Sequence, residues 1–388
     1  MNHFIKNIRI TKLYQLAGIN IPITDDRYPH LIITGKNGSG KTVLLNIIAD
    51  ALQIMKNGGS NKSTLGVSLA NLCSDSVQIV KKYGDVTCIL DGYPKFEQED
   101  FVTALYQADR SIKMIEPDSP QKPQVNTSDI RKSSSEQFIK FLVDMKFQEL
   151  LSISNQDNEK ANDIKIWFND FENLLKEIFE DNNLTLNFNQ DNRYTFIISK
   201  NGQKFGFNEM SDGFKAVLNI VADLILRMQD GNQVSKAYLK KGIVLIDEIE
   251  THLHLELQKM VMPFLTKVFP NIQFIVTTHS PFVLSSMPNA VAYDLEHQKP
   301  VNNLAQYSYE SLAEGYFGVT AISSDIQHRL NIIKELLDKE DLSVSEKATL
   351  RNYLKDFDNI PEAVSPSLIG EYLQTKLKHI VKIKELMQ

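Results

Sequence analysis

A glycine-rich phosphate-binding loop constrains this chain more than any other feature, because such a loop needs a strand before it and a helix after it. It follows the apolar run Leu31–Ile33 and precedes a helix-like stretch over 43–52. Glycines let the backbone curl until several N–H groups point at one anion, and the helix N-terminus adds positive potential. The sequence therefore predicts a nucleotide site on an α/β fold. The loop consists of Gly35, Lys36, Asn37, Gly38, Ser39, Gly40, Lys41 and Thr42.

Two side chains of this loop suit a nucleoside triphosphate and its metal ion. Lys41 is placed to reach the β- and γ-phosphates, and Thr42 offers its hydroxyl to Mg²⁺. The alternative, a plain glycine-rich turn, explains neither the strand nor the helix around it. We therefore expect a bound nucleotide with Mg²⁺.

A second set of polar residues follows two further apolar runs. Residues Ile243–Ile246 fit a buried strand, and Asp247 and Glu248 emerge at its carboxyl end, where ligands bind in parallel sheets. We expect Asp247 to hold Mg²⁺ and Glu248 to orient and deprotonate the attacking water. The next strand, over 272–276, leads to His279, which can reach a γ-phosphate. The alternative for His279 is a purely structural role.

The order of phosphate loop, acidic strand end and histidine resembles the ABC and SMC-like ATPases. The resemblance implies an ABC-type head, with a mixed α/β sheet and flanking helices, that binds and hydrolyses ATP with Mg²⁺. Such proteins carry a signature before the acidic strand, and Ser211, Asp212 and Gly213 occupy that place, with Asp212 where transporters have glycine. The signature is then expected to cap nucleotide bound to another copy of the chain. An ordinary serine N-cap is the alternative.

The same resemblance assigns two more positions. His254 lies in the expected D-loop, where aspartate is usual, and Gln107 follows the strand over 101–106 as the candidate Q-loop glutamine. His252 and His254 could also form a metal pair, but the sequence offers no convincing third ligand. Arg110 fits a role in the helical lobe or at a phosphate equally well.

The block from Gly242 to Ser286 narrows the resemblance. It is similar to the RecF-like and OLD-like ATPases of bacterial defence, and most to the ATPase subunit of Septu-type anti-phage systems, including those attached to retrons. Such subunits work beside a separate HNH nuclease, so the resemblance implies an effector partner of that kind. OLD nucleases carry a Toprim domain, for which the chain after 319 lacks the strand-rich, acidic sequence. We therefore expect no nuclease activity from this chain itself.

Pattern and composition predict four parts in the chain. The prolines and serines of 116–135 indicate a mobile linker or a solvated loop. No sustained heptad pattern fills 42–211, which excludes a long coiled-coil arm. The expected parts are 1–115, the first ATPase lobe with the phosphate loop; 116–183, a linker and an inserted helical lobe; 184–318, the signature, acidic strand and histidine; and 319–388, a helical C-terminal tail.

Composition limits the other function classes. A net charge of −6 argues against a protein that coats nucleic acid by charge alone. No apolar run approaches the roughly 18 residues of a membrane span, so we expect a cytoplasmic protein without a membrane partner. Cys73 and Cys88 are too few and too far apart for a zinc or redox motif, and we expect buried, inert thiols.

Two mechanisms fit these observations. In the first, a homodimer or higher oligomer sandwiches ATP between one loop and another copy's signature, and the switch gates the effector. In the second, a RecF-like repair clamp binds DNA or RNA directly, with the basic stretch 376–384 as its support. That stretch also fits one face of a solvated helix. A scaffold that never hydrolyses ATP is disfavoured by the intact site, and a transporter subunit by the altered signature.

Overall fold

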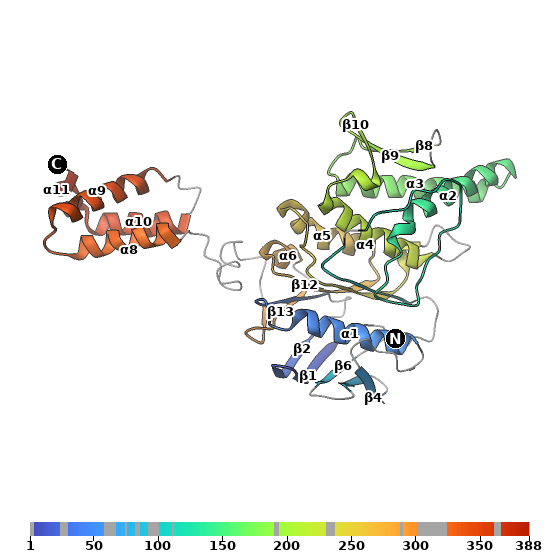
Figure 1. Cartoon of the computed structure of the whole chain (residues 1–388), viewed down its shortest axis with the longest axis horizontal. Coiled ribbons are helices and arrows are strands. Elements are labelled where there is room, and N and C mark those ends of the chain that lie inside the picture. Colours follow the sequence, from blue (N-terminus) through green and yellow to red (C-terminus); the bar gives the residue numbers. More distant parts are fainter. Residues whose placement is uncertain are drawn as a thin grey trace. The chain divides into compact units, whose positions relative to one another are not determined.

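The structure is a computed structural model of the chain (Figure 1). The chain forms two compact units, Met1–Tyr309 and Glu310–Gln388. The boundary expected near 319 lies outside the described residues. The structure describes residues 4–23, 30–57, 67–73, 76–81, 86–91, 101–110, 112–189, 194–229, 237–287, 290–301, 324–360 and 366–387.

A six-stranded, largely parallel sheet forms the centre of the first unit. Its strands are β3 (Leu31–Thr34), β7 (Val102–Tyr106), β11 (Gly242–Ile246), β12 (Ile272–Thr277), β13 (Val291–Asp294) and β14 (Lys299–Val301). The order is β14-β13-β3-β12-β11-β7, and β14 pairs antiparallel at one edge. The strands β3, β7, β11 and β12 are buried along their whole length, as expected for parallel strands covered on both faces.

Helix α1 (Lys41–Lys56) lies between this sheet and an antiparallel second sheet (Figure 1). The second sheet has the order β2-β1-β6-β5-β4. Its strands are β1 (Asn7–Leu13), β2 (Leu16–Pro22), β4 (Val67–Cys73), β5 (Ser76–Lys81) and β6 (Val86–Asp91). Because α1 is covered on two sides, its apolar residues are buried around most of the helix and join one core with β1, β2 and β3. This packing fixes the phosphate loop at the start of α1.

Helices α4 (Asp212–Met228), α5 (Leu255–Val268) and α6 (Pro281–Ser286) cover the other face of the central sheet (Figure 1). A buried polar network fixes α4 on β7. The hydroxyl of Tyr106 donates to Asp223 Oδ2 at 2.7 Å, and Arg227 Nε donates to the same oxygen at 2.7 Å. The signature at the N-terminus of α4 is therefore held by a buried helix.

The inserted lobe contains a sheet as well as helices. Helices α2 (Phe138–Ser154) and α3 (Asn158–Ile178) form an antiparallel hairpin. The three-stranded sheet packs on α3 through stacked rings of Phe168 and Phe196, 5.6 Å apart. The described residues of the first unit also form three short 3₁₀ helices, η1 (Ser135–Gln137), η2 (Phe207–Glu209) and η3 (Ala237–Leu239). The sheet has the order β10-β9-β8, with β8 (Thr185–Asn189), β9 (Thr195–Lys200) and β10 (Gln203–Gly206).

The segment 112–134 has no regular helix or strand, but it is not the free linker that its composition indicates. Arg227 Nη2 donates to Lys132 O at 2.6 Å, and Ser134 N donates to Asp223 Oδ1 at 2.5 Å. On the other side, Arg131 pairs with the buried carboxylate of Asp50 in α1 at 2.8 Å. These long-range bonds from α1 and α4 hold the segment in place.

The second unit, described from 324, has its own core. Helices α8 (Ser324–Asp338), α9 (Val344–Asp358), α10 (Pro366–Lys378) and α11 (Ile380–Met387) form it. Its buried residues include Leu330, Ile333, Leu350, Phe357 and Tyr372. The basic stretch 376–384 is divided between the end of α10 and the start of α11. Within the described residues, no helix of either unit is long and apolar enough to cross a membrane.

Candidate nucleotide site

The carboxyl ends of four adjacent parallel strands bring the predicted residues to one edge of the sheet. The phosphate loop 35–42 follows β3, and His279 lies just beyond β12. Asp247 and Glu248 follow β11, and Gln107 follows β7. Because β3, β12, β11 and β7 are parallel neighbours, these residues leave the sheet on the same side.

The phosphate loop has the backbone that its glycines predict. Gly35, Gly38 and Gly40 have φ values of 131°, 82° and 98°, in the region that side chains rarely adopt. The ammonium of Lys41 donates to Gly35 O at 2.7 Å and to Lys36 O at 3.0 Å. The loop therefore curls around its own lysine, which suits a phosphate cradle.

The two oxygens assigned to Mg²⁺ lie next to each other. Thr42 Oγ1 donates to Asp247 Oδ1 at 3.2 Å, although the two residues are 205 positions apart in the sequence. Thr277 Oγ1 donates to the same carboxylate oxygen at 2.6 Å. A hydroxyl and a carboxylate are hard oxygen ligands of the kind that Mg²⁺ prefers. The donor set therefore fits this ion.

The residues 247–254, which we call the acidic turn, are bound tightly to the end of β12. Glu248 N donates to Thr277 Oγ1 at 2.8 Å. Glu250 accepts from Thr278 Oγ1 at 2.7 Å and from the backbone N of His279 at 2.5 Å. The sequence alone assigned no role to Thr277 or Glu250. The sequence feature that could have indicated them is the pair Thr277 and Thr278 at the end of β12, together with a third carboxylate, Glu250, after β11.

Arg110, whose role the sequence left open, serves the backbone of this turn. It is 4% exposed and its guanidinium donates to Asp247 O at 2.9 Å and Glu248 O at 3.1 Å. Burial lowers the pKa of Arg110 to about 10, while the carboxylates of the turn oppose that effect. The group therefore keeps its charge at neutral pH.

Burial and neighbouring charges change the pKa values of the two basic side chains at the site, Lys41 and His279. Burial lowers the pKa of Lys41, and the carboxylates of Glu248, Glu250 and Asp247 raise it again. Burial also lowers the pKa of His279, and the positive charge of Lys41 lowers it further. A neutral imidazole is therefore favoured next to a charged ammonium. Such a histidine can donate or accept one hydrogen bond.

The signature lies at the start of α4. Ser211 is exposed at the N-cap position, but its side chain makes no capping hydrogen bond. Gly213 packs against the acidic turn so closely that a Cβ would lie 2.9 Å from His252 O. Between the described signature and phosphate loop of one chain, the structure shows no hydrogen bond or ion pair. The structure thus brings the loop and acidic turn together, but leaves Ser211 outside that contact.

His254 lies at the start of α5, and Gln107 lies directly after β7. His254 is the N-cap of α5, where Nδ1 accepts from Leu257 N at 3.4 Å. Gln107 directly follows β7 with its side chain exposed, and its carbonyl accepts from Arg110 Nη1 at 3.1 Å. Within the described part of the chain, neither residue forms a hydrogen bond with the phosphate loop.

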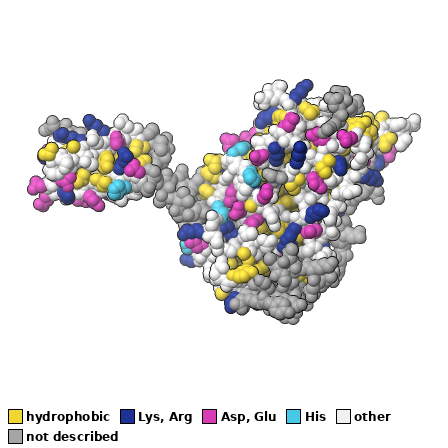
Figure 2. Space-filling model, viewed as in Figure 1, with side chains coloured by type: hydrophobic (Ala, Val, Ile, Leu, Met, Phe, Trp, Pro, Cys, Tyr) yellow, Lys and Arg dark blue, Asp and Glu magenta, His cyan; other side chains and the backbone are white. Residues whose placement is uncertain are grey.

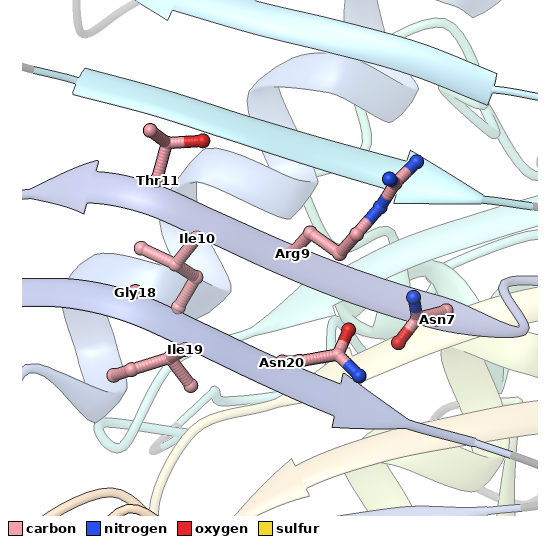
Figure 3. A pocket seen from close by; sticks show the side chains of 7 residues that line it. All are labelled: Asn7, Arg9, Ile10, Thr11, Gly18, Ile19 and Asn20. Atoms are coloured by element: carbon pink, nitrogen blue, oxygen red, sulfur yellow. The ribbon is translucent and has the colours of Figure 1, made fainter.

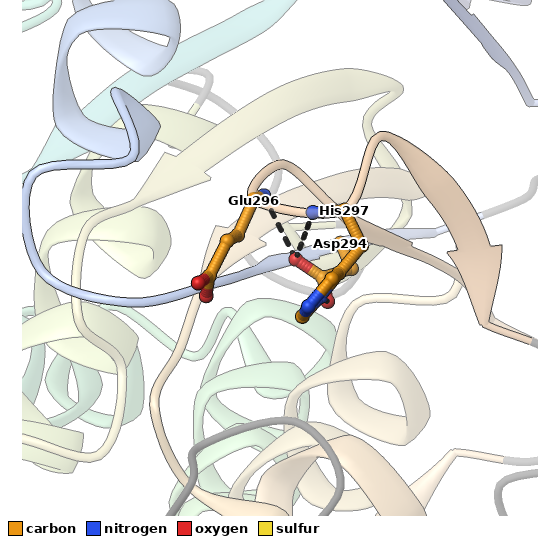
Figure 4. Close-up of side chains that lie close together, drawn as sticks. All are labelled: Asp294, Glu296 and His297. Carbon is orange, nitrogen blue, oxygen red and sulfur yellow. Dashed lines mark hydrogen bonds and ion pairs between the residues drawn. The ribbon is translucent and has the colours of Figure 1, made fainter.

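A cluster of possible metal ligands lies behind the phosphate loop (Figure 4). It contains Asp294, Glu296 and His297, and not the pair His252 and His254. Asp294 Oδ1 accepts from Glu296 N at 2.8 Å, and Asp294 Oδ2 pairs with His297 Nδ1 at 2.6 Å. Glu296 also pairs with Lys36 of the loop at 2.9 Å. These bonds explain the cluster as a brace for the loop.

A hollow on the antiparallel sheet lies between β1 and β2 (Figure 3). None of the predicted site residues lines it. Its lining residues are Asn7, Arg9, Ile10, Thr11, Gly18, Ile19 and Asn20.

Known proteins share the central part of this chain. Residues 104–285 match the family described as "AAA domain, putative AbiEii toxin, Type IV TA system". Over 158 residues the chain is 35% identical to the Retron Ec83 probable ATPase of Escherichia coli, an alignment that covers 34% of this chain and 29% of that protein. Over 299 residues it is 26% identical to the Septu protein PtuA of Bacillus thuringiensis, covering 72% and 73% of the two chains.

The chain is thus similar to proteins named as retron probable ATPases and as a Septu protein. The matched family range includes the signature, the acidic turn and His279, while the phosphate loop precedes it. The alignments span less than a third of the length of the two retron proteins, 29% and 21%. Among solved structures, an SMC head bound to the C-winged helix domain of ScpA covers 78% of this chain and 100% of that chain, with a TM-score of 0.41 and 14% identity.

Proposed function

We propose that this chain hydrolyses ATP within a nucleotide-bridged homodimer and acts as a switch for an effector protein in anti-phage defence. The observation that carries the proposal is the junction of Thr42 with Asp247 at 3.2 Å, directly beside Glu248. This junction joins a phosphate-binding loop to a potential general base across the sheet. The similarity to Septu and retron proteins supports the defence role.

Each residue of the site has a distinct role in the proposed hydrolysis. The N–H groups of the phosphate loop and the ammonium of Lys41 bind the phosphates. Thr42 and Asp247 would hold Mg²⁺, which when bound would neutralise phosphate charge. The carboxylate of Glu248 orients the attacking water and takes its proton. His279 contributes a neutral hydrogen-bonding group at the end of β12.

Dimerisation supplies what one chain lacks at this site. The hydroxyl of Ser211 is exposed and is not used to cap its own helix. The N-terminus of α4 also carries the positive end of a 17-residue helix. We propose that Ser211, Asp212 and Gly213 of one copy face the phosphates held by the other. ATP then stabilises the closed dimer, because it binds both copies at once.

The partner is proposed to bind on the inserted lobe or the second unit. Figure 2 shows hydrophobic side chains at the free end of the α2–α3 hairpin, where Leu151 is 60% exposed and Ile153 is 54% exposed. In the second unit, Leu377 and Val381 are each 68% exposed. Such apolar side chains are suited to a protein interface. The resemblance to Septu-type subunits favours a nuclease of the HNH type as the effector.

Mass photometry of the Glu248→Gln variant tests the switch. The variant keeps the loop and the Thr42–Asp247 junction, so we expect it to bind ATP and accumulate as a dimer with ATP and Mg²⁺. The wild-type chain should form that dimer only transiently. Lys41→Ala is the control, which should stay monomeric because it loses a phosphate contact. Wild-type turnover by Glu248→Gln would contradict the assignment of the base.

A clamp that binds nucleic acid directly is the second candidate, supported by the basic stretch 376–384. Three of its lysines are already engaged inside the second unit. Lys376 pairs with Asp358 at 2.6 Å, Lys378 pairs with Asp338 at 3.4 Å, and Lys382 donates to Leu337 O at 2.9 Å. Adding duplex DNA to the mass-photometry experiment separates the candidates. Dimers that ignore DNA favour the protein effector, whereas salt-sensitive assembly on DNA favours the clamp.

A further inference from the structure

The guanidinium of Arg110 is committed to backbone oxygens. The residue lies three positions beyond Gln107, is 4% exposed, and donates to five main-chain carbonyls. The acceptors are Gln107 O at 3.1 Å, Asp247 O at 2.9 Å, Glu248 O at 3.1 Å, Ile249 O at 3.1 Å and Thr251 O at 3.3 Å. Four of the five belong to the acidic turn. One guanidinium therefore binds four backbone carbonyls of the acidic turn.

The acidic turn needs such a centre because its backbone is irregular. Glu248 and His252 have φ values of 44° and 69°, a left-handed conformation that residues with a Cβ avoid. The turn lies between β11 and α5, so its inward carbonyls are outside both the strand ladder and the helix. A buried carbonyl without a donor is costly. The planar guanidinium offers several donors in a fixed fork, which a lysine ammonium cannot match.

Arg110 also connects this turn to the signature helix. Its own carbonyl accepts from Asn219 Nδ2 of α4 at 2.7 Å. At the N-terminus of the same helix, Gly213 packs directly on His252 O of the acidic turn. The turn is thus held by Arg110 on one side and touched by α4 on the other. Buried and partly buried contacts therefore join α4 to the backbone of Glu248.

We propose that Arg110 is a positioning residue: it holds the backbone of Glu248 in the left-handed conformation and couples it to the signature helix. The proposal rests on the proposed function, because the coupling matters only if Glu248 is the base. The hydrogen bonds of the Arg110 guanidinium in the described chain go to backbone oxygens. Its contribution is to keep the base aligned when a second copy docks on the signature.

Arg110→Lys tests this role against Arg227→Lys as a matched control. Arg227 is 6% exposed and donates to Asp223 and to three backbone carbonyls, but none of these belongs to the acidic turn. Both changes remove a buried guanidinium, so both lower stability. We expect Arg110→Lys to reduce kcat by roughly 100-fold, the order of loss from misplacing a catalytic group, with little change in nucleotide affinity. Arg227→Lys should keep kcat close to wild type.

Hydrogen exchange provides a readout that does not depend on ATP hydrolysis. Amides of residues 249–253 should exchange faster in Arg110→Lys and unchanged in Arg227→Lys, because only the first loses the donors that hold this turn. Asn219→Leu is a milder variant that removes only the link from α4 to Arg110. It should preserve the exchange of the turn and weaken the ATP-dependent dimer of the Glu248→Gln chain by about 10-fold, or 1.4 kcal/mol.

The outcomes separate this inference from the proposed function. If Arg110→Lys loses kcat and the protection of 249–253, the inference holds. If Arg110→Lys hydrolyses ATP normally while Glu248→Gln is inactive, the function stands and the inference is overturned. If exchange of the turn is unchanged in Arg110→Lys, the inference is overturned whatever the activity. If wild type hydrolyses no ATP but the turn still loosens, the function fails and the positioning of the turn by Arg110 remains.

Discussion

The hydroxyl of Thr277 binds both Asp247 and Glu248, so one substitution at Thr277 tests how these two residues are held at the end of β12. Thr277 is fully buried at the end of β12. Its Oγ1 accepts from Glu248 N at 2.8 Å and donates to Asp247 Oδ1 at 2.6 Å. Thr277→Val keeps the volume and shape of the side chain but removes both bonds. Thr277→Ser is the matched control, because it keeps the hydroxyl and removes one methyl group.

The two lost bonds set the expected magnitude. A hydrogen bond to a charged carboxylate contributes about 1.5–3 kcal/mol, and leaving a buried N–H unsatisfied costs about 1–3 kcal/mol. Asp247 keeps its bond from Thr42, and Glu248 is only partly buried, so the lower half of each range applies. We therefore expect Thr277→Val to lower the free energy of unfolding by about 2–4 kcal/mol. Thr277→Ser should lower it by about 1 kcal/mol, the cost of a buried methyl group.

Tryptophan fluorescence during urea unfolding measures the difference in the free energy of unfolding between the two variants, and it does so for the structural unit that contains Thr277. The chain has one tryptophan, Trp167, which is 2% exposed in the inserted lobe and therefore reports on the unit Met1–Tyr309. ATP turnover is measured on the same samples and should fall by roughly 10-fold or more in Thr277→Val, because Glu248 loses its anchor to β12. Equal stability and turnover in the valine and serine variants would refute the reasoning.

Two further predictions concern the packing of the signature and a buried histidine. Gly213→Ala places a Cβ 2.9 Å from His252 O, so differential scanning calorimetry should show the unit Met1–Tyr309 destabilised by about 1–3 kcal/mol. Wild-type stability of this variant would show that the acidic turn moves aside without cost. Burial lowers the pKa of His30 from 6.5 to about 4, where its Nδ1 accepts from Phe274 N at 3.1 Å. As pH falls from 6.5 to about 4, the unfolded chain binds a proton that the folded chain does not, so the free energy of unfolding drops by about 3 kcal/mol in all and levels off below that range. His30→Gln, whose carbonyl can accept the same bond, should remove this part of the pH dependence in urea titrations, and an unchanged slope would assign it to other groups.

Particular elements show where sequence reasoning works for this chain. The strands before the phosphate loop and before Asp247 were predictable, because a run of apolar residues that is buried on both faces has few alternatives. The segment 112–134 was not predictable, because its prolines and serines indicate a loop but say nothing about its anchors. These are the ion pair of its Arg131 with Asp50 of α1 and the bond from Arg227 of α4 to Lys132 O.

The sequence by itself determined the local geometry on which the proposed chemistry rests. Glycines that tolerate left-handed backbone, a lysine and threonine at the start of a helix, and two carboxylates after an apolar strand are local features that suit the proposed binding of phosphate and Mg²⁺. Only the tertiary structure decided what supports that chemistry. The role of Arg110 depends on its contact with Asp247, 137 positions away in the sequence. The role of Thr277 depends on its contact with Glu248, 29 positions away. Such contacts arise from the packing of strands that are distant in the sequence, and no local pattern encodes them.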